Sequence, residues 1–180
     1  MEQGVVMQRK SMLAIGFGAA AFLTLTGSAL AQSPDPESQS FIKTAIQGNI
    51  AEIDVGKLAQ KKGKNPAVKQ YGAMLVKDHG AANSKAKEAA KSVKVSPPTG
   101  SSVAEKATYL KLKLLSGASF DNAFAKAMAS DHENDIKEYQ KEAQKTDAVG
   151  SYAKESLPTL QKHLQAAQKL EQELQQTKNK

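Results

Sequence analysis

The stretch KVSPPTGSS (residues 94–102) decides the fold, because it interrupts a chain whose apolar residues otherwise recur at helical spacing. A Pro-Pro pair, a glycine and three serines exclude a continuous helix through it. Helical patterns cover 39–62 and 66–93 before the breaker, and 120–145 and 152–178 after it. The short polar connection within each half predicts an antiparallel hairpin, and the breaker begins the longer connection between the two hairpins.

The longer connection contains a helical segment of its own, over 103–115, followed by SGAS (116–119). Ser119 is predicted to be the N-cap of the next helix. Four long helices with one long crossover predict an all-α, ferritin-like four-helix bundle, with a short extra helix in a crossover that runs the length of the bundle. Pro158 is predicted to kink the last helix or to mark its true start.

The first 31 residues have the three parts of a secretory signal peptide: a basic start, an apolar run over 12–25 and small residues that end at Ala31. Cleavage after Ala31 and a periplasmic location are therefore predicted. The rest of the chain is predicted to consist of a disordered linker (32–38) and the bundle (39–178). Met7 is a second candidate for the initiating residue.

The composition of the chain limits which classes of partner it is expected to bind. The chain has 25 Lys and Arg against 18 Asp and Glu, a formal net charge of +7, and no cysteine. Its lysines are scattered at helical intervals and are not clustered with aromatic residues, which indicates a solvated surface with weak attraction to anionic envelope polymers and no nucleic-acid partner. After the signal peptide no apolar run is long enough to span a bilayer. The sequence leaves open whether the chain forms a homo-oligomer. The lack of a nucleophile elbow or phosphate loop favours a non-catalytic protein over an enzyme.

The three histidines share a property: each lies on the core-facing stripe of a different helix. Within SDHEND (130–135), His132 and Asp135 face the core while Asp131 lies off that line. His132 and His163 stand equally far from the second turn, so they are predicted to share one layer of the bundle.

Glu52 is the one acidic residue in the middle of the apolar stripe of the first helix, where an unpaired carboxylate is costly. Its distance from the first turn places it roughly 6 Å off the level of His79, at about 1.5 Å of rise per residue. Gly48 is predicted to lie opposite His79 instead.

These positions define a candidate metal site. The candidate ligands all face the core: His79, His132, His163, Glu52 and Asp135. The residues predicted to support them by hydrogen bonds are Asp78, Asp131 and Tyr139. Three imidazoles with carboxylates suit zinc, copper or a single iron. A di-iron carboxylate site is disfavoured, because none of the histidines has the Glu-x-x-His spacing.

A second interpretation needs no metal. Buried histidines can also satisfy one another and neighbouring acids in a hydrogen-bonded network that sets the register of a bundle. Residue types and spacing do not separate this network from a metal site. Two functions therefore stay open: a non-catalytic envelope protein with a buried network, or a redox or storage protein of ferritin type that binds zinc, copper or iron.

Three segments resemble a known family: FIKTAIQGNIAEIDVGKLAQKKGKNPAVKQYGAMLVKDHGAAN (41–83), SGASFDNAFAKAMASDHEND (116–135) and LPTLQKHLQAAQKL (157–170). Together they are similar to the bacterial exported family called domain of unknown function 4142. The resemblance implies a ferritin-like bundle in the cell envelope, with no settled activity, for which an association with envelope stress is one expectation. The family's motif positions correspond here to Asp78, His79, Asp131, His132 and His163.

Overall fold

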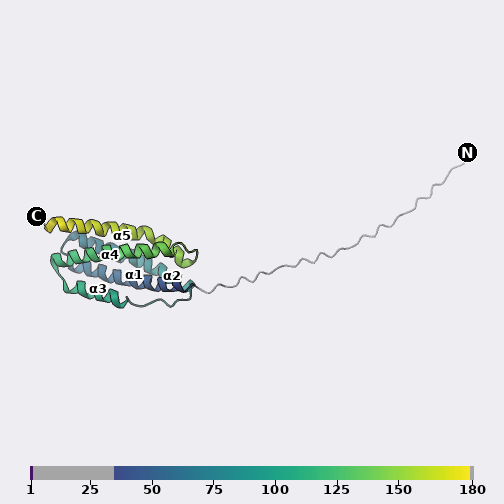
Figure 1. Ribbon diagram of the computed structural model, residues 1–180, viewed down its shortest axis with the longest axis horizontal. Coiled ribbons are helices and arrows are strands. Elements are labelled where there is room, and N and C mark those ends of the chain that lie inside the picture. Colours follow the sequence, from purple (N-terminus) through teal and green to yellow (C-terminus); the bar gives the residue numbers. More distant parts are fainter. Residues whose placement is uncertain (2–34, 179–180) are drawn as a thin grey trace. The chain divides into compact units, whose positions relative to one another are not determined.

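The structure is a computed structural model that describes Met1 and residues 35–178, so the predicted signal peptide and its cleavage after Ala31 lie outside the described residues. The described residues form five helices: α1 (Pro36–Lys62), α2 (Pro66–Ser92), α3 (Val103–Leu114), α4 (Gly117–Glu142) and α5 (Ala148–Lys178). The predicted all-α bundle with one long crossover and a short extra helix is confirmed (Figure 1).

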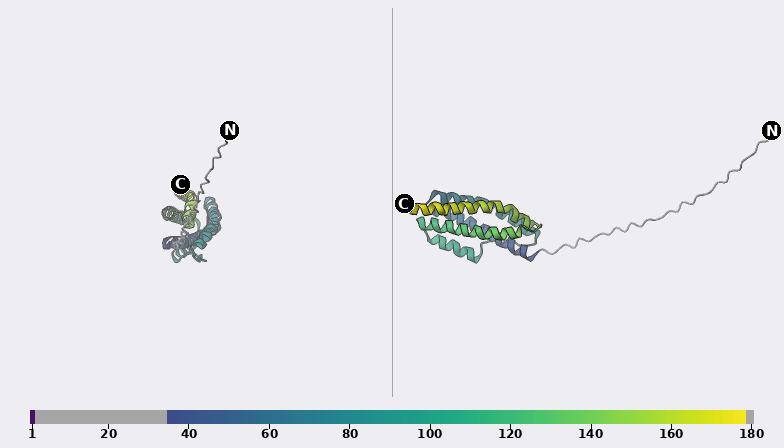
Figure 2. Two further views of the ribbon diagram at one scale, coloured as in Figure 1. Left: turned by 90° about the vertical axis from the view of Figure 1, so that its right-hand side faces the viewer. Right: turned by 45° about the horizontal axis from the view of Figure 1, so that its top comes forward.

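Two antiparallel hairpins make up the bundle. α1 packs along α2 and α4 packs along α5, while α2 meets α5 and α1 meets α4 across the interface between the hairpins. α3 lies on the outside, against α1 and the start of α4, in both orientations shown (Figures 1 and 2). The crossover therefore returns the chain along the length of the bundle, as predicted.

Buried side chains fix the ends of the hairpins to each other. Asp121, near the start of α4, accepts hydrogen bonds from the backbone N–H groups of Lys64 (3.0 Å) and Asn65 (2.8 Å) in the α1–α2 turn. At the other end, the Ser38 hydroxyl donates to Glu142 at the end of α4. These contacts set the axial register of the two hairpins, and with it the heights of the side chains between them.

Three helix starts differ from the prediction: α1 and α4 each begin three residues earlier than expected, and α5 begins at Ala148 and not at residue 152. α1 begins at Pro36, because Asp35 accepts from the N–H of Glu37 and the proline occupies the first turn, where its missing N–H is not needed. Residues 36–38, predicted to be linker, are therefore helical. α4 begins at Gly117 after the N-cap Ser116, so the prediction that Ser119 caps it is wrong; Gly117 adopts φ +56°, which favours glycine.

Pro158 lies inside α5, which begins ten residues earlier at Ala148. The prediction that this proline marks the helix start is wrong. Pro158 is exposed, and so is Lys154 one turn before it. The carbonyl of Lys154, which loses its helical partner at the proline, can be hydrated there, and the helix tolerates the interruption.

Close contact between α1 and α2 depends on a pair of glycines. A Cβ added to Gly56 would lie 2.7 Å from the carbonyl oxygen of Gly72, and one added to Gly72 would lie 2.6 Å from the carbonyl oxygen of Gly56. Both helices therefore approach backbone to backbone at this point, which draws the side chains one or two turns away into the same layer.

The core consists of two apolar clusters separated by a polar layer. One cluster lies toward the α1–α2 turn and includes Leu75, Phe120, Phe124, Met128 and Leu170. The other lies toward the α4–α5 turn and includes Ile42, Ile46, Tyr139, Val149 and Tyr152. Between them the buried residues are polar: Asn49, Glu52, His79, His132 and His163. None of the described helices combines the length and the apolar character that crossing a bilayer demands.

Candidate metal centre

The three histidines converge at the middle of the bundle, from α2, α4 and α5. Nδ1 of His163 lies 3.2 Å from Nε2 of His79 and 3.2 Å from Nε2 of His132. One nitrogen of each ring falls within a group whose atoms all lie within 4.8 Å of one another. The side chains are buried, at 3% exposed for His79 and 0% for the other two. The predicted common layer of His132 and His163 agrees with this arrangement.

The nitrogens on the outer side of His132 and His163 each face an oxygen acceptor. Nδ1 of His132 lies 2.9 Å from the carbonyl oxygen of Met128, one turn earlier in α4. Nε2 of His163 lies 3.0 Å from Oδ2 of Asp78. A carbonyl or carboxylate oxygen accepts hydrogen bonds, so each of these outer nitrogens carries the hydrogen.

His79 is held in the same way from α1. Its Nδ1 lies 2.9 Å from Oδ1 of Asn49 and 2.9 Å from Oε2 of Glu52. The amide of Asn49 donates through Nδ2 to the hydroxyl of Tyr152 at 3.0 Å, which turns its oxygen toward the histidine. The outer nitrogen of His79 therefore also donates.

With every outer nitrogen protonated, each neutral ring presents a lone pair to the centre. Lone pairs 3.2 Å apart in a dry interior repel one another unless a cation lies among them, either a proton or a metal ion. In a tetrahedral zinc site with Zn–N bonds of about 2.0–2.1 Å, neighbouring nitrogens lie roughly 3.3 Å apart. The spacing on either side of His163 Nδ1 matches that geometry.

The charges around the rings set where a proton resides when no metal is bound. Burial opposes a charge on His79, but the carboxylate of Glu52 outweighs it and raises the pKa of His79. Burial also opposes the charge of Glu52, which by itself would raise the pKa of this carboxyl. Attraction to His79 and then to His132 outweighs burial and lowers the pKa of Glu52 to about 2. Burial, together with the charges of its two neighbours, lowers the pKa of His163 to about 4 despite its bond to Asp78. These opposite shifts favour a proton on His79 over one on His163.

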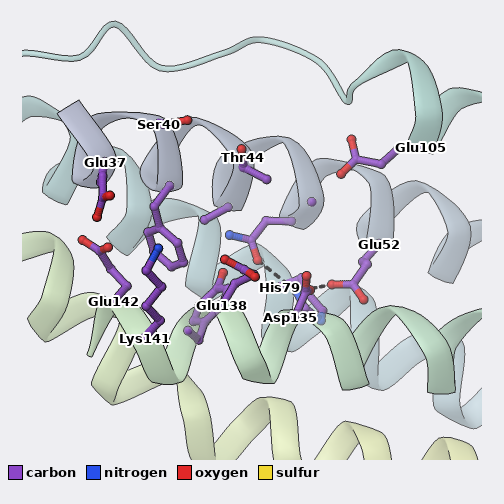
Figure 3. A pocket seen from close by; sticks show the side chains of 15 residues that line it. Glu37, Ser40, Thr44, Glu52, His79, Glu105, Asp135, Glu138, Lys141 and Glu142 are labelled. Carbon is purple, nitrogen blue, oxygen red and sulfur yellow. Dashed lines mark hydrogen bonds and ion pairs between the residues drawn. The ribbon is translucent and has the colours of Figure 1, made fainter. Parts of the chain in front are cut away.

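Glu52 lies closer to the histidines than predicted. One of its oxygens lies 2.9 Å from Nδ1 of His79 (Figure 3) and the other lies 3.4 Å from Nδ1 of His132, so these side chains meet despite the expected offset of roughly 6 Å between their levels. The counting along the helices used Cα heights, whereas helical side chains lean toward the N-terminus of their helix. α1 and α2 run in opposite directions, so Glu52 and His79 lean toward each other and close the offset.

This contact also changes the role expected for Glu52. The carboxylate lies behind the rings, at their outer nitrogens, and not at the centre where the inner nitrogens meet. Oε1 of Glu52 is buried and has no hydrogen-bond partner among the described residues. Gly48, predicted to lie opposite His79, instead faces Glu105 of α3, and Asn49 takes the place beside the imidazole.

The remaining predicted residues lie around this core. Asp135 lines the same cavity as Glu52 and His79 (Figure 3), where burial and then the charge of Glu52 raise its pKa to about 8. Asp131 lies nearer to solvent; burial and then Glu52 raise its pKa to about 6. Neither aspartate has a hydrogen bond or ion pair to a histidine among the described residues. The geometry therefore does not place either carboxylate at the centre where the inner nitrogens of the three rings meet.

Tyr139, predicted as a supporting residue, is connected to the centre through two residues that sequence reasoning missed. Its hydroxyl lies 3.2 Å from that of Tyr152, which accepts from Asn49, which in turn accepts from His79. A signal for Asn49 was present, because it continues the buried row of Ile42 and Ile46 at helical spacing.

Two cavities reach the histidine cluster from opposite sides of the bundle. One, of about 310 Å³, opens between α1 and α4 and is lined by Glu52, Asp135 and Tyr139 (Figure 3). The other, of about 300 Å³, opens between α2 and α5 and is lined by Asp78 and Tyr152. Asn49 and His79 line both. Both cavities therefore bring polar lining residues up to His79.

Fold and site together define an all-α bundle with a buried cluster of three histidines. A family model matches residues 24–170, most of the chain, and the protein belongs to that family, the domain of unknown function DUF4142. No curated protein and no solved structure matches the chain. The family assignment agrees with the resemblance found in the sequence and brings no biochemical activity with it.

Proposed function

We propose that this protein binds one divalent transition metal ion through Nε2 of His79, Nε2 of His132 and Nδ1 of His163. The observation that carries the proposal is the hydrogen bonding of the three rings. Each ring is buried, each outer nitrogen donates to an oxygen, and the inner nitrogens are left 3.2 Å apart around His163 with only lone pairs between them.

The donor set indicates which ions would bind. Three imidazole nitrogens suit zinc, copper and iron, whereas magnesium and calcium prefer oxygen ligands. Hydrogen bonds from ligating histidines to carboxylates or carbonyls, such as those to Asp78 and Met128, orient the rings and increase their basicity. The carboxylates of Glu52 and Asp78 would balance the charge of the ion. Three protein ligands leave a fourth position for water or a small exogenous ligand.

The second candidate function is the structural one. The raised pKa of His79 beside Glu52 favours one proton among the rings, and such a protonated network could fix the register of the bundle without metal. The two candidates differ in what fills the centre, so measurements with and without metal separate them.

We further propose that the site serves metal holding or storage in the bacterial periplasm and is non-catalytic, with an envelope-stress role as the setting. The N-terminal pattern of basic, apolar and small residues supports export. Expression of the full chain in a bacterium followed by N-terminal sequencing of the periplasmic protein tests this. The expected first residue is Gln32, and recovery of the uncut chain from the cytoplasm alone would contradict export.

The test of metal binding uses the chain from Gln32 to Lys180, which contains all five described helices and both core clusters. The chain is stripped with chelator, incubated with zinc, copper(II) or iron(II), dialysed and analysed for metal and thermal stability. We expect about one zinc or copper per chain and a higher melting temperature, since an ion at 100 times its Kd adds about 2.7 kcal/mol.

Glu133→Gln is the matched control, since this exposed carboxylate adjoins His132 in sequence but bonds to Gln168 on the outside of the bundle. The control should bind metal like the original chain. Less than about 0.1 metal per chain, with no shift in melting temperature, would leave the structural network as the function of the cluster.

A further inference from the structure

The outward face of α3 carries exposed apolar side chains. Val103, Leu110 and Leu114 are 85%, 56% and 87% exposed, and apart from Met1 they are the large apolar residues exposed to this degree in the described part of the chain. Their spacings of seven and four residues place them on one line of the helix, which exposed Ala107 completes. We call these four residues the α3 stripe.

The α3 stripe is not the face by which α3 packs on the bundle. Leu112 is buried in the core cluster near the α1–α2 turn, and Tyr109 packs against the same cluster. The Nζ of Lys62 in α1 donates to the carbonyl oxygen of Lys113, close to the end of α3. The helix is therefore already attached through its inner side, and the α3 stripe points the opposite way, where its large side chains stay exposed among the described residues.

Lysines border the α3 stripe on both sides. At 100° per residue, Lys106 and Lys113 lie on one edge of it and Lys111 on the other, and all three are exposed. The single acidic residue of α3, Glu105, is turned inward, where its carboxylate accepts from the N–H of Ser102 in a capping box. Three lysines of α1 lie beside the end of α3 around a shared surface cavity: Lys57, Lys61 and Lys62.

We propose that α3 is a membrane-docking helix, whose stripe inserts into the headgroup region of a bilayer that contains anionic lipids. An apolar line bordered by lysines is the pattern of helices that lie in a membrane interface: the apolar side chains enter it, and the ammonium groups meet phosphates. α3 lies lengthwise on the outside of the bundle in Figure 1 and in the right-hand view of Figure 2, so the bundle would rest with its long axis along the membrane.

A lipid surface fits the stripe better than a second copy of the chain. Two α3 helices packed face to face would bring six lysines together, which like-charge repulsion opposes. A 12-residue helix is about 18 Å long, and a stripe one helix wide is narrow against the roughly 800 Å² per partner that a stable dimer buries. Anionic headgroups instead complement the lysines. The inference does not depend on the proposed metal binding.

Flotation with vesicles tests the proposal on the chain from Gln32 to Lys180. We expect binding to vesicles of phosphatidylglycerol and phosphatidylcholine, binding at least about tenfold weaker to phosphatidylcholine alone, and release at 0.5 M salt, where the Debye length falls to a few ångströms. The double variant Leu110→Ser/Leu114→Ser should lose at least about tenfold in partition coefficient, because it removes the two largest side chains of the stripe.

Two matched comparisons separate the stripe from general basicity. The triple variant Lys106→Gln/Lys111→Gln/Lys113→Gln should bind vesicles weakly. Its control has the same net charge but is changed at exposed sites of α4 and α5: Lys126→Gln/Lys137→Gln/Lys154→Gln. The control should bind like the original chain. The chain has no tryptophan, so Leu110→Trp introduces a single probe, with Gln172→Trp on α5 as its control. Vesicles should blue-shift the emission of the former and leave the latter unchanged.

Any of three results would overturn the proposal. The first is equal binding of the two triple-lysine variants. The second is an emission shift at residue 172 as large as that at residue 110. The third is self-association of the chain in the absence of lipid that the double serine variant abolishes, which would assign the stripe to a second copy of the chain.

Discussion

Polar side chains are usually exposed and apolar ones buried, and two regions of this molecule depart from that distribution in opposite ways. They are the middle layer of the bundle and the outer face of α3. The middle layer buries three histidines and a carboxylate between two apolar clusters, whereas α3 presents apolar side chains to solvent. Each arrangement is unfavourable for the protein alone, and each would be relieved by a partner of matching chemistry: a cation inside, and a lipid surface outside. The two regions are therefore the candidate binding regions of this molecule.

The two regions differ in how firmly the fold holds them. Each buried ring has a neighbour on both sides, and the layer is enclosed by core residues, so a change there affects stability as well as binding. The α3 stripe is more than half exposed at each of its large side chains, so changes to it should affect binding alone. The predictions below test that difference, beginning with the largest effect.

Replacing His163 by Ala should have the largest effect, because Nδ1 of His163 is the atom that both other histidines approach at 3.2 Å. We expect at least about 1,000-fold weaker zinc binding, or roughly 4 kcal/mol, measured by competition with a chromophoric chelator. In chelator the same variant should lose about 1–3 kcal/mol of unfolding free energy in urea, since its buried partners lose their bonds. A purely structural cluster would show the second loss without any metal binding to lose.

Asp78→Asn should have the next largest effect. The asparagine keeps the size of the side chain but removes the charge that orients Nε2 of His163 from 3.0 Å. Loss of such an orienting carboxylate typically weakens metal binding 10–100-fold, or about 1.4–2.7 kcal/mol. Isothermal titration with zinc measures it, with Asp54→Asn, an exposed site on α1, as the control. Unchanged affinity would show that Asp78 does not support the ligand.

The fold was largely predictable because its signals are local. The breaker at 94–102 and the Gly63–Pro66 turn are readable from residues next to one another. The start of α1 has an equally local signal, because Asp35 and Pro36 form an N-cap and first-turn pair, but the prediction placed both residues in the linker. For the site, helical periodicity predicted which residues face inward and which of them share a layer, and it predicted nothing further.

The missed parts of the site depend on side-chain direction and on backbone partners. The contact of Glu52 with His79 arises because two antiparallel helices lean their side chains toward each other, which residue counting does not include. The acceptor for His132 is a backbone carbonyl, that of Met128, and no residue type reveals it. The exposed face of α3 was equally hidden, because its sequence has apolar residues on two sides, and packing alone decides which side is buried.

Asp135→Asn should stabilise the protein, with a smaller effect that depends on pH. Burial and then the charge of Glu52 raise the pKa of Asp135 in the folded protein from its ordinary value of 3.8 to about 8. A raised carboxyl pKa means that the folded state holds its proton more tightly, so stability is lost as pH rises from about 4 to 8. The full shift would correspond to about 5–6 kcal/mol, and solvent screening of this half-buried carboxyl reduces that value. The asparagine should therefore add roughly 1–2 kcal/mol near pH 8 and nothing near pH 4, measured by urea unfolding in chelator. A gain that is the same at both pH values would mean that the cost does not come from ionisation.

The double variant Leu110→Ser/Leu114→Ser should have the smallest effect on folding. Because both side chains are more than half exposed and contact no core cluster, the unfolding free energy should stay within about 0.5 kcal/mol of the original. The matched comparison is Leu112→Ser on the inner side of the same helix, where a buried leucine should cost at least about 2 kcal/mol. Urea unfolding of both variants, without lipid, measures the contrast. If the double variant were destabilised as much as Leu112→Ser, the α3 stripe would be part of the core, and the contrast between a region held by the fold and a region left for a partner would fail.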